Sequence, residues 1–138
     1  MVMHAAPLSW RRIGEWYRPG TPKGVVGIQL ALNSSMLTLM LALHQTPWLA
    51  LAGLTLCLVA TLWLHAARRR VLIVLYGLAG WGAEAWLVGV GKIWRFDQAA
   101  TGFWDGGLFG VPFYMIVTWS LSGALMIALM DWLERPER

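Results

Sequence analysis

The sequence predicts an all-α fold, a polytopic integral membrane four-helix bundle preceded by a short N-terminal interfacial helix. The chain of 138 residues is 58% hydrophobic and 13% charged, which leaves too little polar surface for a soluble domain. Four apolar stretches are each about 20 residues long, the length at which a helix crosses the hydrocarbon core of a bilayer. Most basic residues lie beside these stretches, on one predicted side of the membrane.

The apolar stretches are expected to be helices because backbone groups in hydrocarbon must be paired within their own segment. Short connections join the first three, so consecutive helices are expected to be antiparallel neighbours in a compact bundle. The predicted division is a cytoplasmic or interfacial segment at 1–23, the bundle at 24–131 and a cytoplasmic tail at 132–138. Within the bundle, the helices are expected at approximately 25–43, 47–66, 71–90 and 111–130, with an outer loop at 91–110.

The distribution of lysine and arginine predicts the orientation. Only Lys92 and Arg95 fall on one side of the membrane. Nine basic residues fall on the other: Arg11, Arg12, Arg18, Lys23, Arg68, Arg69, Arg70, Arg135 and Arg138. The positive-inside rule therefore places both termini in the cytoplasm. Because the basic residues flank apolar spans, the net charge of +4 does not predict a nucleic-acid partner.

The segment before the first span predicts an amphipathic helix in the cytoplasmic interface. Ser9 is a candidate N-cap, and Pro19 and Gly20 end the segment. The apolar face would consist of Trp10, Ile13, Trp16 and Tyr17, with the arginines off that face. Such a helix would lie on anionic lipid. The alternative is a basic tail without helical structure.

Glu84 is the main candidate for chemistry. It lies inside the third apolar stretch, where a carboxylate costs several kcal/mol unless it is paired or protonated. One interpretation is a catalytic acid or a ligand anchor. The other is a structural role, in which Glu84 joins helices through polar groups at similar depth such as Thr38 and Thr118. Gln29 and Asn33, four residues apart, share a helix face nearer the cytoplasm.

Tryptophans supply the other candidate site residues. Of the ten in the chain, several lie deep in the spans, where an indole N–H needs a partner or a ligand. The aromatic loop at 91–110 is expected to fold over Glu84 as a lid, or to form an aromatic belt at the interface. The predicted ligand-binding residues are Asn33, Trp81, Thr118, Trp119 and Trp104. The histidine and cysteine pattern predicts no metal site, and no motif identifies a cofactor.

Small residues predict close helix contacts. Gly77 and Gly80 form one candidate face of the third helix, while Gly82, Ala85 and Gly89 form another. The fourth helix repeats the pattern at four-residue spacing, with Ser120, Ala124 and Ala128. Such small-xxx-small patterns indicate close packing, within the chain or between copies.

The order of features along the chain from Val25 onward allows a comparison with known families. The features are Asn33, the Trp48 turn, Arg68 to Arg70, a third helix of glycines with Glu84, and a fourth helix from Pro112 through Trp119 to Asp131-Trp132-Leu133. This order resembles a bacterial family of small four-helix inner-membrane proteins of unknown function. The resemblance implies a location in the bacterial cytoplasmic (inner) membrane. Members are often found beside lipid-modifying enzymes, which implies membrane lipids as partners.

A second pattern comprises Glu84-x4-Gly89, Phe96 and Gly110-Val111-Pro112 followed by Trp119. It is similar to part of the carotenoid 1,2-hydratase type of membrane protein, over about the second half of the chain. Those proteins are larger and have more helices. The similarity implies that Glu84 is an acid that protonates an isoprenoid double bond.

Two functional interpretations remain open. In the first, the bundle handles or binds a lipid or isoprenoid ligand near Glu84, which is the polar anchor or proton donor. In the second, the protein is a non-catalytic accessory subunit of a larger membrane complex, such as a pigment-binding or electron-transfer assembly. Its surface would then pack against partner transmembrane subunits or further copies of itself. The sequence leaves open whether the protein is an enzyme.

Overall fold

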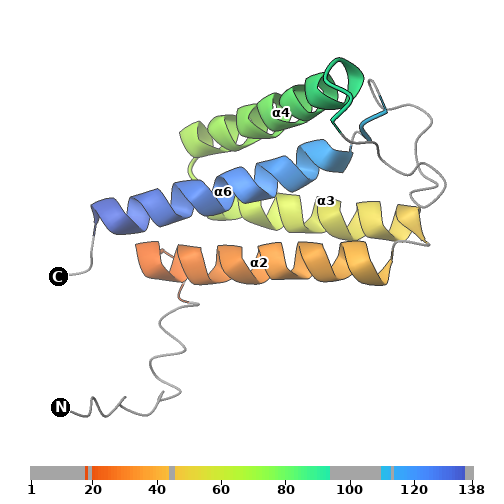
Figure 1. The fold of residues 1–138 in the computed structure, drawn as a ribbon. Helices are drawn as coiled ribbons and strands as arrows, with labels where there is room; N and C mark the ends of the chain where they lie inside the picture. The colour runs from red at the N-terminus through yellow and green to blue at the C-terminus, as the bar shows by residue number, and fades with distance from the viewer. Residues whose placement is uncertain (1–17, 19, 44–45, 94–109, 113, 136–138) are drawn as a thin grey trace, which may run out of the picture.

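The computed structural model describes residues 18, 20–43, 46–93, 110–112 and 114–135. This part of the chain is mainly helical, as predicted, and contains four α-helices (Figure 1). They are α2 (Pro22–Ala42), α3 (Pro47–Leu64), α4 (Ala67–Gly89) and α6 (Tyr114–Glu134). Three of them, α2, α4 and α6, are long and apolar enough to cross a membrane, and α3 is apolar over Leu49–Leu64. The predicted interfacial helix and most of the aromatic loop lie outside the described residues.

The helix starts follow from local chemistry. Thr21 caps α2, because its Oγ1 accepts a hydrogen bond of 3.0 Å from the Gly24 N–H, and Pro22 occupies the first turn. The structure begins α4 at Ala67, four residues before the predicted start at Val71. The three arginines expected in a loop therefore lie in the first turns of α4.

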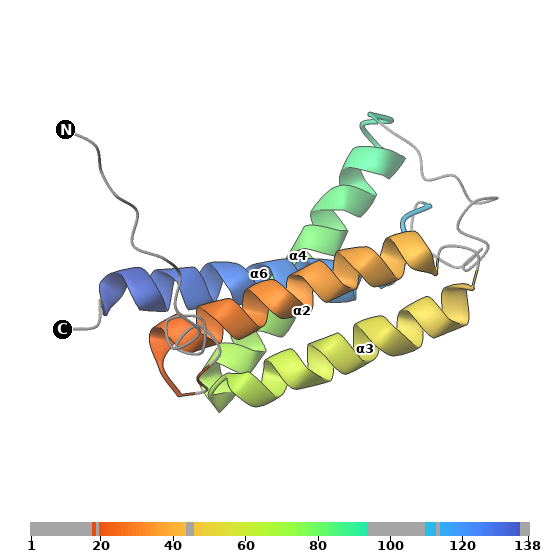
Figure 2. The ribbon, with the colours of Figure 1, turned by 90° about the horizontal axis from the view of Figure 1, so that it is seen from below.

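The helix α6 is the one around which the others assemble. It packs against α4, α2 and α3, and α2 also packs against α3. Figures 1 and 2 show α2, α3 and α6 running side by side, with α2 antiparallel to both α3 and α6, and α4 on the opposite side of α6. Among the described helices α4 packs extensively against α6 alone, although a short turn joins it to α3. Sequence neighbours are therefore not always packing neighbours here.

Small residues bring α4 and α6 close together. A Cβ atom added to Gly77 would lie 2.6 Å from the Ile116 carbonyl oxygen, and one added to Gly80 would lie 2.6 Å from the Trp119 ring. Ser120, Ala124 and Ala128, the predicted small-residue face of the fourth helix, are buried. A Cβ on Gly82 would have no neighbour within 4 Å. The close contact thus uses the face of Gly77 and Gly80.

Polar side chains join α2 to its neighbours. Gln29 is fully buried, and its Nε2 donates to Thr61 Oγ1 on α3 at 3.2 Å and to the Leu121 carbonyl on α6 at 3.5 Å. Asn33 Nδ2 donates to the same carbonyl at 3.2 Å. Next to these bonds, an apolar cluster packs the same three helices together and contains Met36, Leu54, Cys57 and Leu121. Cys57 is buried within this cluster.

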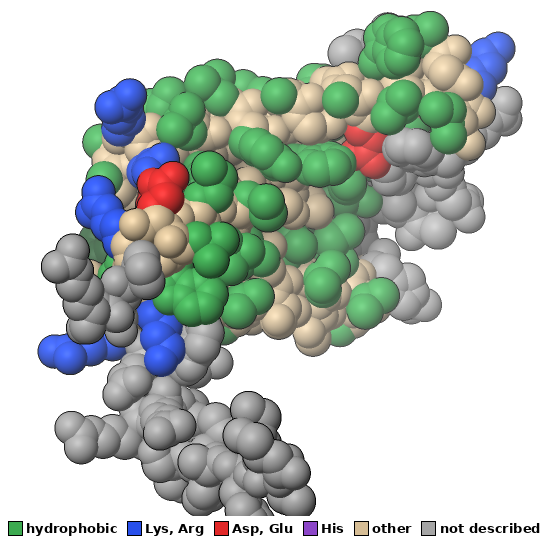
Figure 3. Space-filling model, turned by 60° about the vertical axis from the view of Figure 1, so that its left-hand side comes forward, with side chains coloured by type: hydrophobic (Ala, Val, Ile, Leu, Met, Phe, Trp, Pro, Cys, Tyr) green, Lys and Arg blue, Asp and Glu red, His purple; other side chains and the backbone are tan. Residues whose placement is uncertain are grey.

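Six of the seven described Lys and Arg residues gather at one end of the molecule. Figure 3 shows lysine and arginine side chains at the end that holds the start of α2, with hydrophobic side chains over the middle. The residues at this end are Arg18, Lys23, Arg68, Arg69, Arg70 and Arg135. Lys92, just beyond α4, lies at the opposite end. This asymmetry matches the charge pattern that predicted the orientation.

Candidate functional site

Glu84 lies on the side of α4 that faces α6, five residues before the end of the helix. Its side chain is buried, with 8% of the residue surface exposed. The Trp119 indole on α6 donates its Nε1–H to Glu84 Oε2 at 2.9 Å. The carboxyl group is therefore held by a neighbouring helix, as an ionisable group in an apolar environment requires.

The position of the Trp119 ring depends on Gly80, one helical turn before Glu84. The indole lies against the Gly80 backbone, in the space that a larger side chain would fill. Tyr76, a further turn away, packs against the Trp119 ring in a tilted arrangement, with ring centroids 6.4 Å apart and ring planes at 49°. The residues at 76, 80 and 84 thus form one face of α4 on which the Trp119 ring rests.

A groove of about 360 Å³ runs along this face, and Glu84 is part of its lining. Its lining consists of Tyr76, Ala79, Gly80, Ala83, Glu84, Leu87 and Trp119. Because Ala79 and Ala83 are exposed, the groove opens on the outside of the α4–α6 pair. The volume lies in the range of small-molecule pockets, and an apolar wall with one polar group is typical of them.

The groove offers a limited chemistry. Among the described residues that line it, the ionisable side chains are the Glu84 carboxyl and the Tyr76 phenol. A carboxylate accepts hydrogen bonds from a ligand hydroxyl or amine, and a protonated carboxyl donates one. The remaining lining binds hydrocarbon. An elongated apolar ligand with one hydrogen-bonding group would therefore match both parts of the groove.

The structure brings two of the predicted site residues together, Glu84 and Trp119. The threonines considered as partners of Glu84 bond within their own helices. Thr38 donates to the Ser34 carbonyl at 2.9 Å, and Thr118 donates to the Tyr114 carbonyl at 3.5 Å. Glu84 bonds instead to Trp119, the residue next to Thr118, which the sequence did not single out as its partner.

The other predicted ligand-binding residues lie elsewhere. Asn33 is at the contact between α2 and α6, where its amide bonds the Leu121 carbonyl. Trp81 Nε1 donates to the Val111 carbonyl at 3.4 Å and so ties α4 to the segment before α6. Trp104, with the proposed lid, lies outside the described residues.

Sequence reasoning missed Tyr76, Ala79, Ala83 and Leu87 as groove residues. A signal for them was present, because positions 76, 80, 84 and 87 follow the helical spacing of one face. Gly80 was noted as a packing residue, but its role in seating the Trp119 ring depends on the opposite helix.

Among the described residues, no group of three or more His, Cys, Asp or Glu side chains is placed to hold a metal ion. Comparison with protein-family models, with curated proteins and with solved structures found no match to this chain. A functional assignment must therefore come from the geometry and chemistry of the site itself.

Proposed function

We propose that the protein is an integral protein of the bacterial cytoplasmic membrane that binds a lipid or isoprenoid ligand in the groove beside Glu84. The observation that carries this proposal is a buried carboxyl group in the lining of an apolar groove that opens on the outer face of α4 and α6. A lipid-facing groove receives its ligand directly from the bilayer, which consists of molecules with elongated hydrocarbon chains.

In this proposal all four helices span the membrane as a bundle and both termini are cytoplasmic. The length and composition of α2, α4 and α6 support spanning, and α3 runs between the same two ends of the molecule (Figure 1). The basic end would face the cytoplasm. Glu84 then lies in the outer half of the membrane, because it is in the last part of α4, which ends away from the basic residues.

Glu84 is the polar anchor of the ligand. Trp119 holds one carboxyl oxygen at 2.9 Å, which orients the group toward the groove. The aromatic faces of Tyr76 and Trp119 and the side chain of Leu87 supply dispersion contacts to a hydrocarbon chain. In a catalytic version of this function, the same carboxyl group would protonate an isoprenoid double bond.

The test is co-purification of ligand with the full chain, extracted gently from its own membrane and examined by native mass spectrometry and lipid extraction. Ala83→Leu fills the groove, leaves the identities of Glu84 and Trp119 unchanged, and is expected to abolish co-purification. Gly82→Leu adds similar bulk at the adjacent position, which has open space, and is the matched control. Equal ligand content in Ala83→Leu and Gly82→Leu would contradict the groove as the binding site.

Glu84→Gln separates anchoring from catalysis. The amide keeps the shape and one hydrogen-bond acceptor but loses the titratable proton. Retention of the ligand without its chemical conversion would identify Glu84 as an acid. Loss of the ligand from a stable protein would identify it as an anchor.

A second candidate function is that of a non-catalytic accessory subunit, favoured by the packing of α4. Because this helix packs extensively against α6 alone among the described helices, much of its surface is left for a partner. Trp86 on that surface is 60% exposed. Recovery of the chain only in a larger assembly or homo-oligomer, from which Trp86→Ala releases it, would support this alternative.

A further inference from the structure

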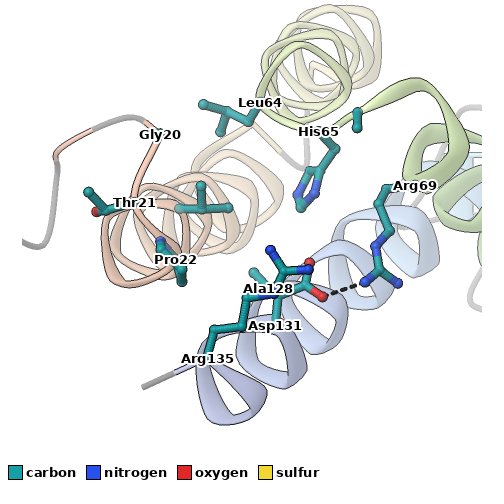
Figure 4. Close-up of a pocket in the computed structure, with 11 residues that line it drawn as sticks. Gly20, Thr21, Pro22, Leu64, His65, Arg69, Ala128, Asp131 and Arg135 are labelled. Carbon is teal, nitrogen blue, oxygen red and sulfur yellow. Dashed lines mark hydrogen bonds and ion pairs between the residues drawn. The ribbon is translucent and has the colours of Figure 1, made fainter. Parts of the chain in front are cut away.

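A second pocket lies at the basic end of the molecule, far along the helices from Glu84. It has a volume of about 370 Å³. Three segments line it: the start of α2 from Gly20, the turn between α3 and α4, and the last turns of α6 (Figure 4). Among the described residues that line the pocket, the charged and titratable side chains are His65, Arg69, Asp131 and Arg135.

His65 is a buried polar side chain aimed into this pocket. Only 6% of its surface is exposed, and Figure 4 shows the imidazole pointing toward Ala128 and Asp131. Its Nε2 atom is buried and has no hydrogen-bond partner among the described residues. Buried polar atoms are nearly always paired in folded proteins. The unpaired nitrogen is therefore a candidate to bond a ligand group in the pocket.

The charge around His65 favours an anion. Arg69 pairs with Asp131, the one acidic side chain among the described residues that line the pocket, and neutralises it. Arg135 lies on the same rim, beside Asp131 in Figure 4, and forms no ion pair with an acidic side chain among the described residues. Two guanidinium groups thus face one carboxylate. The first turn of α2, which borders the pocket, contains no acidic residue and carries Lys23.

Helix ends add to this preference. The N-terminus of α2 opens on the pocket, and the N-terminus of a helix carries partial positive charge. The backbone carbonyl of His65, at the C-terminus of α3, would repel an anion, but it accepts a hydrogen bond of 2.8 Å from Arg70 Nε. The Asp131 carboxylate and the His65 carbonyl are therefore each engaged by an arginine of α4.

We propose that this pocket binds a phosphate group, with Arg135 and Arg69 pairing with its oxygens and His65 Nε2–H donating from the floor. The planar guanidinium presents paired donors that match phosphate oxygens. The phosphate would belong either to the headgroup of an anionic phospholipid in the inner leaflet or to a free phosphate compound of the cytoplasm. This site is independent of the groove beside Glu84.

The experiment uses the full chain in a maltoside detergent, which contains no phosphate. Isothermal titration calorimetry and thermal unfolding are followed with three probes: inorganic phosphate, dihexanoyl phosphatidic acid, and dihexanoylglycerol as the same acyl chains without phosphate. We expect saturable binding and stabilisation with a phosphate-bearing probe and none with dihexanoylglycerol. Equal potency of inorganic phosphate identifies a free phosphate ligand, and binding of phosphatidic acid alone identifies a lipid headgroup.

Variants locate the site. Arg135→Gln and His65→Asn are each expected to weaken binding by about tenfold or more, the effect of losing one charged hydrogen bond. Arg68→Gln removes an exposed arginine at the same end that does not line the pocket, and it should leave binding unchanged. Glu84→Gln should also leave it unchanged, so that failure of one site is not confused with failure of the other. Absence of binding by both phosphate probes, or equal weakening by Arg68→Gln and Arg135→Gln, would overturn the proposal.

Discussion

The indole of Trp119 on α6 and the carboxyl group of Glu84 on α4 are joined by a hydrogen bond of 2.9 Å across 35 positions of sequence. This bond holds an ionisable side chain in an apolar environment and joins two residues of the groove lining. The two side chains meet because Gly80 lets the indole lie against the α4 backbone. Substitutions of Trp119, Glu84 and Gly80 should therefore each change the stability of the protein in a different way.

We expect Trp119→Phe to destabilise the protein by about 1–2 kcal/mol, because it keeps an aromatic ring but removes the N–H that bonds Glu84. The measurement is thermal or denaturant unfolding in detergent. Glu84→Gln keeps an acceptor for the indole and should cost less than Glu84→Leu, which leaves the N–H unpaired. Equal costs for these two Glu84 variants would show that the hydrogen bond contributes nothing.

Gly80→Leu is expected to separate α4 from α6. An added Cβ alone would lie 2.6 Å from the Trp119 ring, so the ring or the helix must move, at a cost of about 1–3 kcal/mol. Gly82→Leu is the matched control, since a Cβ there has no neighbour within 4 Å. Unfolding in detergent compares the two variants, and a similar loss of stability in both would argue against the α4–α6 packing described here.

The buried amide of Gln29 predicts different stability costs for a substitution of Gln29 and for one of its partner Thr61. Its Nε2 donates to Thr61 Oγ1 at 3.2 Å, while its Oε1 has no hydrogen-bond partner among the described residues. Thr61→Val removes an acceptor of the amide and should cost about 1 kcal/mol. Gln29→Met removes the unsatisfied oxygen together with the donor and should be close to neutral. In the Gln29→Met background, Thr61→Val should then cost less than in the native protein, which a double-mutant cycle measures.

Stability at the basic end is expected to depend on pH through His65. Burial lowers the pKa of its imidazole from the ordinary value of 6.5; Asp131 opposes this effect and Arg69 adds to it. Because the folded pKa lies below the unfolded one, the unfolded chain binds more protons as the pH falls through about 6.5. The stability contributed by neutral His65 is thus present above that pH and is lost as the pH falls toward the folded pKa.

The measurement for His65 is the unfolding temperature between pH 8 and pH 5 in detergent. His65→Gln should flatten this dependence. An unchanged slope in His65→Gln would show that another group controls the pH response.

Several features of the fold could be predicted from the sequence because they are local. The lengths of the apolar stretches indicated the helices, and their composition singled out Glu84 as a carboxyl group in an apolar helix. The small-residue face of Ser120, Ala124 and Ala128 was also visible as a spacing. By contrast, the start of α4 was placed too late, because Arg68 to Arg70 were interpreted as a loop although arginines are good helix formers.

The partner of Glu84 and the residues of the groove could not be predicted with the same success. Depth along the helices suggested Thr38 and Thr118, but hydroxyl groups in helices readily bond the carbonyl one turn before, and both do so here. Trp119 reaches Glu84 instead because its long side chain crosses the contact opposite a glycine. That relation depends on two helices at once.

The sequence by itself therefore determined where the apolar helices lie and which end of the molecule is basic, since both follow from hydropathy and charge along a single stretch. Only the tertiary structure decided that α6 is the central helix, that α4 packs on it rather than on α3, and that His65 meets Arg69, Asp131 and Arg135 in one pocket. The physical reason is that helix partners are chosen by the fit of side chains across an interface, such as Trp119 over Gly80, and this fit has no signature in the periodicity of either helix alone.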